Sequence, residues 1–154
     1  MSKALWNSVL LRLSEHEYMG DIQRTAERVK ASGEVFTPSQ LVVEMLSRLP
    51  IEKFGPGMKV LDPACGDGQF LVGAKWVKVL AHNMTEVDAL DDLYGVDIMR
   101  DNVSLCRARL GGGTILLGDT LRPDIQIDGQ TDEEYRLIRD LFSKTPGQDS
   151  VWSD

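Results

Sequence analysis

The sequence is poor in cysteine and has no long apolar run. Its 154 residues include two cysteines, Cys65 and Cys106, which lie far apart and form no Cys-x-x-Cys pair. Neither a zinc site nor a disulfide framework is therefore predicted. No stretch approaches the roughly 18 consecutive apolar residues of a membrane helix, and the first residues do not resemble a secretory signal. These absences predict a cytoplasmic protein with reduced thiols and no membrane association.

Basic residues are too few to indicate a nucleic-acid-binding surface. Lysine and arginine total 17 against 24 aspartates and glutamates, which gives a net charge of −7 and a pI near 4.8. Unaided binding to a phosphate backbone relies on clustered Lys and Arg. The chain is thus a poor candidate for a stand-alone nucleic-acid binder, although its hydrophobic content of 42% is ordinary for a globular domain.

The first segment, residues 1–50, is predicted to be helical. Apolar residues recur at helical spacing over residues 3–18 and again over about 22–33. A third helix is predicted through residues 41–49, and either Thr37 or Ser39 is expected to cap its start.

The second segment, residues 51–122, alternates short apolar runs with amphipathic helices. The predicted order is strand, helix, strand, helix, strand, with elements at 58–62, 69–81, 93–98, 102–110 and 114–119. A polar connection is predicted at 83–92. Such an alternation is typical of a parallel sheet with helical crossovers. The predicted fold class is therefore α/β, a partial Rossmann-like fold with a parallel βαβαβ half-sheet and N-terminal helices.

The third segment, residues 123–154, is acidic and is predicted to hold one more helix over 132–144, with Ile138 and Leu141 among its inward residues. The first strand of such a sheet normally has a neighbour on each side, whereas the strand at 58–62 would have one. We expect residues 124–145 to fold over the open edge, or another polypeptide to pair with it.

The segment DPACGDGQFL, from Asp62 to Leu71, joins the first predicted strand to the next helix. Gly66 and Gly68 permit backbone angles and a close approach that a β-carbon would block. Open α/β sheets bind ligands at this edge, and amides near a helix N-terminus suit a carboxylate. The dinucleotide pattern Gly-x-Gly-x-x-Gly is incomplete because Leu71 stands in the third place, so a dinucleotide site is disfavoured.

An aspartate stands at the end of each of the three predicted strands. Asp62 could hold an ammonium group, Asp97 a ribose diol and Asp119 an adenine amino group. Taken singly, an aspartate after a strand is more often a turn former or a helix cap. Three of them along one edge, beside a glycine loop, favour a nucleoside-binding site.

The order of these motifs is similar to that of a known family. The chain has FTP, DPACGDGQF, YGVDI and GDTL in succession. From Gly33 to Leu121 it resembles the amino-terminal half of adenine-N6 DNA methyltransferases of the type I and Eco57I-like kind, enzymes of restriction-modification. The resemblance implies a methyltransferase fold and S-adenosylmethionine as the cofactor. It implies cofactor-binding roles for Phe36, Thr37, Pro38, Asp62, Ala64, Gly66, Gly68, Phe70, Asp97, Ile98, Asp119 and Leu121.

The resemblance also implies how the cofactor is held. The FTP segment would flank the methionine part, whose amino and carboxylate groups would contact Asp62 and the glycine loop. Asp97 and Ile98 would hold the ribose and stack near the base, and Asp119 would contact the adenine amino group. Asp67 stands where a serine is common in the family.

The sequence departs from the family because it lacks the catalytic motif. Family members methylate through an Asn/Asp/Ser-Pro-Pro-aromatic motif, whose ring stacks on the flipped base, and this sequence contains no Pro-Pro. Too few residues follow Leu121 for the remaining strands and a DNA-recognition region. We therefore expect a truncated or split enzyme that is inactive alone. A second polypeptide would carry the catalytic and DNA-recognition parts and make the contact with DNA.

Two other interpretations stay open at this point. The chain could be a non-catalytic module that binds S-adenosylmethionine or another protein, derived from a phage or mobile element. It could also be a decayed fragment that folds poorly. A neighbouring gene that encodes Asn-Pro-Pro-Tyr/Phe would favour the split enzyme.

Overall fold

Helices and parallel strands alternate along residues 3–15 and 37–143, the part of the chain that the computed structural model describes. In chain order the elements are α1 (Lys3–Ser14), α4 (Ser39–Ser47), η1 (Ile51–Phe54), β1 (Val60–Asp62), α5 (Gln69–His82), α6 (Glu86–Asp91), β2 (Leu93–Asp97), α7 (Arg100–Leu110), β3 (Thr114–Leu117) and α8 (Asp132–Phe142). This order confirms the predicted α/β class. The helix predicted over about 22–33 lies outside the described residues.

The three strands form one parallel sheet in the order β1-β2-β3. Val60 of β1 pairs with Leu93 of β2, and Tyr94 of β2 pairs with Thr114 of β3. Neighbouring parallel strands need a crossover connection, which includes α5 between β1 and β2 and α7 between β2 and β3. The βαβαβ unit is confirmed, although each strand is shorter than predicted.

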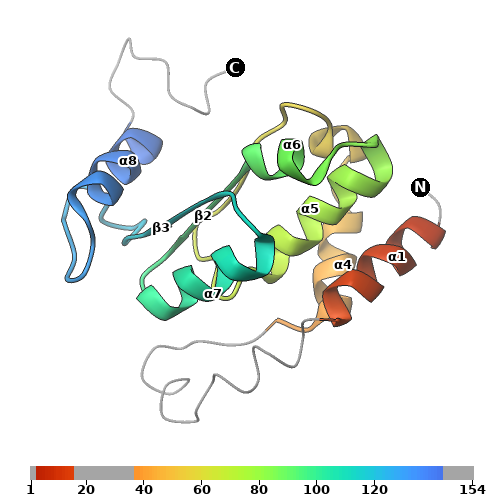
Figure 1. The fold of residues 1–154 in the computed structure, drawn as a ribbon, viewed down its shortest axis with the longest axis horizontal. Helices are drawn as coiled ribbons and strands as arrows, with labels where there is room; N and C mark the ends of the chain where they lie inside the picture. The colour runs from red at the N-terminus through yellow and green to blue at the C-terminus, as the bar shows by residue number, and fades with distance from the viewer. Residues whose placement is uncertain (1–2, 16–36, 144–154) are drawn as a thin grey trace.

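One face of the sheet is covered by α5 and α7, and α1 and α4 pack in turn against α5 (Figure 1). The composition of α5 explains its central place. Leu71, Val72, Ala74 and Val77 are all buried, so the helix is enclosed on more than one side, as a helix with a broad apolar surface must be. Among the helices in residues 3–15 and 37–143, none is both long enough and apolar enough to cross a membrane.

The other face is covered by α8, which Figure 1 shows across the sheet from α5. Ile138 and Leu141, both predicted to face inward, are buried against Val96 of β2 and Leu116 of β3. The helix starts with a capping box formed by Thr131 and a glutamate of its first turn. The sheet is therefore sandwiched between two separate apolar clusters.

The connection predicted at 83–92 is wrong, because it contains helix α6. Thr85 supplies the missing signal: its Oγ1 accepts a hydrogen bond from the amide of Asp88 at 3.1 Å and so caps the helix. Two acidic residues of this stretch, Glu86 and Asp88, lie in the first turn, where the helix dipole favours them.

The outer edge of β3 is closed by side chains. The amide of Leu117 donates to Glu134 Oε2 at 2.8 Å, and its carbonyl accepts from Gln130 Nε2 at 2.8 Å. Arg107 donates to the carbonyl of Ile115. These side chains occupy the positions to which a further strand would bind.

Among the residues that the structure describes, no strand pairs with the outer edge of β1. Within the described residues β1 pairs with β2 alone, as predicted. The amide of Val60 donates to Asp92 on the β2 side at 2.8 Å, and alternate residues point their backbone groups to opposite sides, so those of Leu61 face away from β2. The sequence predicts that residues 124–145, or another polypeptide, cover this edge. The described part of residues 124–145 does not cover it, because α8 packs on the sheet face against β3.

Candidate functional site at the carboxyl edge of the sheet

The carboxyl ends of the strands meet at one edge because the strands are parallel. β1 ends at Asp62, β2 ends at Asp97, and β3 leads through Gly118 to Asp119. The amide of Gly118 donates to the carbonyl of Asp97 at 3.0 Å, which holds the last two strand ends together. All three predicted aspartates therefore belong to the same edge.

The turn between β1 and α5 depends on its glycines. Gly66 has φ 55° and Gly68 has φ 96°, angles that residues with a side chain rarely adopt. A Cβ on Gly68 would also lie 2.7 Å from Cys106 Sγ. The turn can thus lie close to α7, and α5 begins immediately after it at Gln69 with its positive dipole end at this edge.

Asp62 is half-buried beside the glycine turn. Burial raises the pKa of its carboxyl, a hydrogen bond that Oδ1 accepts from the amide of Ala64 at 3.1 Å opposes that rise, and the negative charge of Asp97 adds to it. The two carboxylates are therefore close enough to repel each other. A cationic group placed beside them would relieve that repulsion.

Asp97 is fixed by contacts within the protein. Its Oδ2 accepts from the amide of Gly66 at 2.9 Å, and its Oδ1 accepts from the amide of Met99 at 2.8 Å and from Asn102 Nδ2 at 3.2 Å. Each carboxylate oxygen has two lone pairs, so Oδ2 retains one for a ligand. The carboxylate thus joins the glycine turn to the start of α7.

Asp119 is half-buried at the end of β3. Its Oδ1 accepts from the amide of Leu121 at 3.0 Å, and Arg122 Nε lies 3.5 Å from its Oδ2. Two apolar side chains from the predicted site stand in solvent: Ile98 is 56% exposed and Leu121 is 90% exposed. Exposed apolar side chains beside fixed carboxylates suit a ligand that combines an aromatic ring with polar groups.

The FTP segment is described from Thr37 onward, and Phe36 lies outside the described residues. Neither residue predicted to cap α4 does so, because Pro38 occupies the N-cap position and no side chain caps the helix. Ser39 is instead buried beside Gln69. The carbonyl of Thr37 accepts a hydrogen bond from Gln69 Nε2 at 3.0 Å, which joins this segment to the start of α5.

Phe70 has a different environment from the strand-end aspartates. Its side chain is half-buried and packs against the main apolar cluster, on the side of the sheet that α5 covers. Ala64, in contrast, is exposed in the turn after β1. The turn therefore presents Ala64 to solvent and directs Phe70 toward the protein.

Arg109, in the last turn of α7, is a site residue that sequence reasoning missed. Its side chain is 2% exposed, and it forms an ion pair with Asp67, with 3.2 Å between Nη1 and Oδ2. A basic residue in the last turn of a helix usually lies in solvent near the dipole's negative end. The sequence therefore carries no local signal of this buried contact.

Cys65 and Cys106 lie together, although they are far apart in sequence. Both are buried free thiols. A hydrogen bond with Cys106, burial, and nearby negative charges together raise the pKa of the Cys65 thiol. A thiol held protonated in this way is a poor nucleophile.

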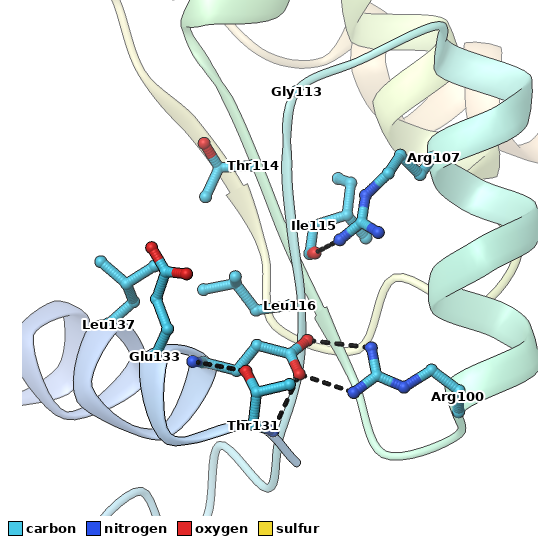
Figure 2. Close-up of a pocket in the computed structure, with 10 residues that line it drawn as sticks. Arg100, Arg107, Gly113, Thr114, Ile115, Leu116, Thr131, Glu133 and Leu137 are labelled. Atoms are coloured by element: carbon cyan, nitrogen blue, oxygen red, sulfur yellow. Dashed lines mark hydrogen bonds and ion pairs between the residues drawn. The ribbon is translucent and has the colours of Figure 1, made fainter. Parts of the chain in front are cut away.

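A separate hollow of about 380 Å³ runs along the outer edge of β3 (Figure 2). Arg100 and Arg107 of α7 reach into it, but each already has a partner. Arg100 lies 2.6 Å from Glu134 Oε1, and Arg107 binds the carbonyl of Ile115. This hollow is therefore lined mainly by residues of α7, β3 and α8. It is distinct from the strand-end site.

The parallel sheet, its crossover helices and the acidic, glycine-containing carboxyl edge define a Rossmann-like α/β protein. A family model for N-6 DNA Methylase matches residues 16–127. The chain thus belongs to the N-6 DNA methylase family, whose members use S-adenosylmethionine. No solved structure matches the chain.

Proposed function

We propose that this chain binds S-adenosylmethionine and forms the cofactor-binding portion of an adenine-specific N6 DNA methyltransferase of the type I or Eco57I-like kind. The observation that carries the proposal is that Asp62 and Asp97 both accept hydrogen bonds from amides of one glycine-containing turn at the carboxyl edge of the sheet. The cofactor fits this edge because it brings an ammonium group, a carboxylate and a ribose diol.

Each strand end would hold a different part of the cofactor. Asp62 would accept hydrogen bonds from the ammonium group, which would also offset the repulsion from Asp97. The Gly66–Gly68 turn and the start of α5 suit the carboxylate. The remaining lone pair of Asp97 Oδ2 would accept a ribose hydroxyl, and Asp119 would accept from the adenine amino group.

The bound cofactor supplies a methyl group on a positively charged sulfur. Residues of this chain would hold both ends of the molecule and so fix the direction in which the methyl group points, and positioning of this kind accelerates a displacement. The sequence contains no Pro-Pro. The groups that hold the target adenine are therefore proposed to come from a second polypeptide, which would also contact DNA.

The outer edge of β1, which pairs with no strand among the described residues, supports the proposal that a second polypeptide completes the enzyme. The outward backbone groups of Leu61 are available to pair with an added strand, whereas side chains close the edge of β3. Leu61 and Tyr94 lie half-buried at the margin of the face that α8 covers. A parallel strand added beside β1 would end next to Asp62, at the edge where the cofactor is proposed to bind.

Titration calorimetry of the purified chain with S-adenosylmethionine tests the binding proposal. We expect a Kd in the micromolar range, and at least about tenfold weaker binding by Asp97→Ala, because a hydrogen bond to a charged group is lost. Asp88→Ala is the matched control, since Asp88 is an exposed aspartate of α6. No heat with the parent chain would refute the proposed function.

A tritium-transfer assay on unmethylated DNA tests the proposed division between two polypeptides. We expect no transfer by this chain alone, because it supplies no Pro-Pro motif to hold the adenine. Transfer by the purified chain would show that the acceptor site is present after all.

A non-catalytic cofactor-binding module is the second candidate, favoured by the same missing motif. Addition of a polypeptide that contains Asn-Pro-Pro-aromatic and binds this chain separates the two. Restored transfer supports the split enzyme, and cofactor binding without transfer supports the module.

A further inference from the structure

The buried side chain of Arg109 binds the glycine turn at residues 66–68. Arg109 Nη1 donates to the carbonyl of Asp67 at 3.1 Å and lies 3.2 Å from the Asp67 carboxylate. Asp67 is the residue between Gly66 and Gly68, and its side chain is 4% exposed. Arg109 therefore contacts both the backbone carbonyl and the side-chain carboxylate of Asp67, the central residue of the turn.

The same guanidinium also reaches the start of α5. Arg109 Nη2 donates to Gln69 Oε1 at 2.6 Å. The amide nitrogen of Gln69 then donates to the carbonyl of Thr37 at 3.0 Å and to Ser39 Oγ at 3.4 Å. A continuous set of hydrogen bonds thus runs from α7 through the glycine turn to the FTP segment.

This connection requires a forked, planar cation. The two terminal nitrogens of Arg109 serve two different acceptors, Asp67 and Gln69. A lysine carries one compact charge and cannot reproduce that geometry. Burial makes the arrangement rigid, because each group that loses its partner would be left without water to replace it.

We propose that Arg109 and Gln69 are positioning residues that fix the separation between the FTP segment and the glycine turn. On the proposed function, from which this inference starts, these two segments are the walls around the methionine part of S-adenosylmethionine. Neither residue needs to touch the cofactor. Arg109 and Gln69 affect how tightly the amino-acid end of the cofactor is held. They do not affect how tightly the nucleoside end is held.

The test compares two ligands on the full chain. S-adenosylmethionine carries the amino-acid end, and 5′-methylthioadenosine keeps the nucleoside without it. Both dissociation constants are measured by ligand-detected NMR, which reaches weak binding. We expect Arg109→Lys to raise the dissociation constant of S-adenosylmethionine about tenfold. The dissociation constant of 5′-methylthioadenosine should change by less than about twofold.

Two further variants keep the test decisive. Gln69→Glu preserves an acceptor for Arg109 and removes the donor to Thr37, so it should show the same ligand-selective loss even if Arg109→Lys folds poorly. Arg107→Lys is the matched control, because Arg107 lies on the same helix and binds the carbonyl of Ile115 instead of the turn. It should change neither constant.

The outcomes separate this inference from the function on which it rests. A parent chain that binds neither ligand overturns both. If the parent chain and Gln69→Glu bind S-adenosylmethionine equally well, the positioning role is overturned and the proposed function is not. Equal weakening of both ligands also overturns it, because general damage to the fold would then explain the loss.

Discussion

Lys78 of α5 is fully buried, and its ammonium group is enclosed by oxygen atoms. It donates to the carbonyls of Gly55 and Met58 at 3.0 and 2.7 Å and pairs with Asp92 Oδ2 at 2.9 Å. Asp92 also accepts from the amide of Gly57 at 3.0 Å. One lysine therefore ties the loop before β1 to the residue before β2.

Substitution Lys78→Met should lower the free energy of unfolding by roughly 3–5 kcal/mol, because it leaves the Asp92 carboxylate buried without its cation. Urea denaturation of parent and variant measures the difference. Lys53→Met, at an exposed lysine of η1, is the control and should change stability little. A loss below about 1 kcal/mol for Lys78→Met would show that the pair contributes little.

At the scale of elements, Glu134 attaches α8 to the rest of the domain. Its carboxylate pairs with Arg100 of α7 and accepts from the amides of Leu117 and Thr131. Burial would raise the pKa of Glu134, but these hydrogen bonds outweigh it and lower the pKa to about 2. One side chain thus caps α8, closes the edge of β3 and contacts α7.

The lowered pKa makes the docking of α8 dependent on pH. The folded pKa lies below the ordinary value of 4.5, so the stabilisation is complete above that value and is lost as pH falls toward about 2. We expect Glu134→Gln to cost about 2 kcal/mol at pH 7, less than the full shift implies because Arg100 is 43% exposed.

Urea denaturation at a series of pH values checks this prediction. The difference between parent and Glu134→Gln should shrink as pH falls below 4.5. Glu133→Gln alters the neighbouring, exposed glutamate and should show little effect at any pH. A difference that stays constant from pH 7 to pH 3 would contradict the assigned role of the charge.

At the scale of the whole molecule, the proposed ligand should stabilise the fold, because it would bind side chains from several elements that only the folded chain brings together. A ligand at 100 times its Kd adds about 2.7 kcal/mol to the free energy of unfolding. For a domain of this size that corresponds to a rise in Tm of roughly 5–10 °C.

Thermal unfolding with and without S-adenosylmethionine measures this rise. The parent chain and Asp88→Ala should both show it, whereas Asp97→Ala at the same ligand concentration should show little. An equal rise in Asp97→Ala would mean that the ligand binds away from the strand ends.

Much of the architecture could be predicted because its signals are local. The alternation of strands and helices follows from apolar spacing, and Ile138 and Leu141 are buried as that spacing predicts. The glycine turn was also predictable, since Gly66 and Gly68 adopt angles that other residues avoid. Helix α6 was missed although Thr85 signals its start, because the surrounding residues are polar and acidic.

The sequence by itself determined the order of the elements, the turn after β1 and the aspartates at the strand ends, because backbone preferences depend on near neighbours along the chain. Tertiary structure alone decided that Lys78 and Arg109 are buried and that Cys65 meets Cys106. Arg109 and Gln69 are 40 residues apart in sequence. Their contact exists because parallel strands and crossover helices bring distant segments to one edge, which no local pattern encodes.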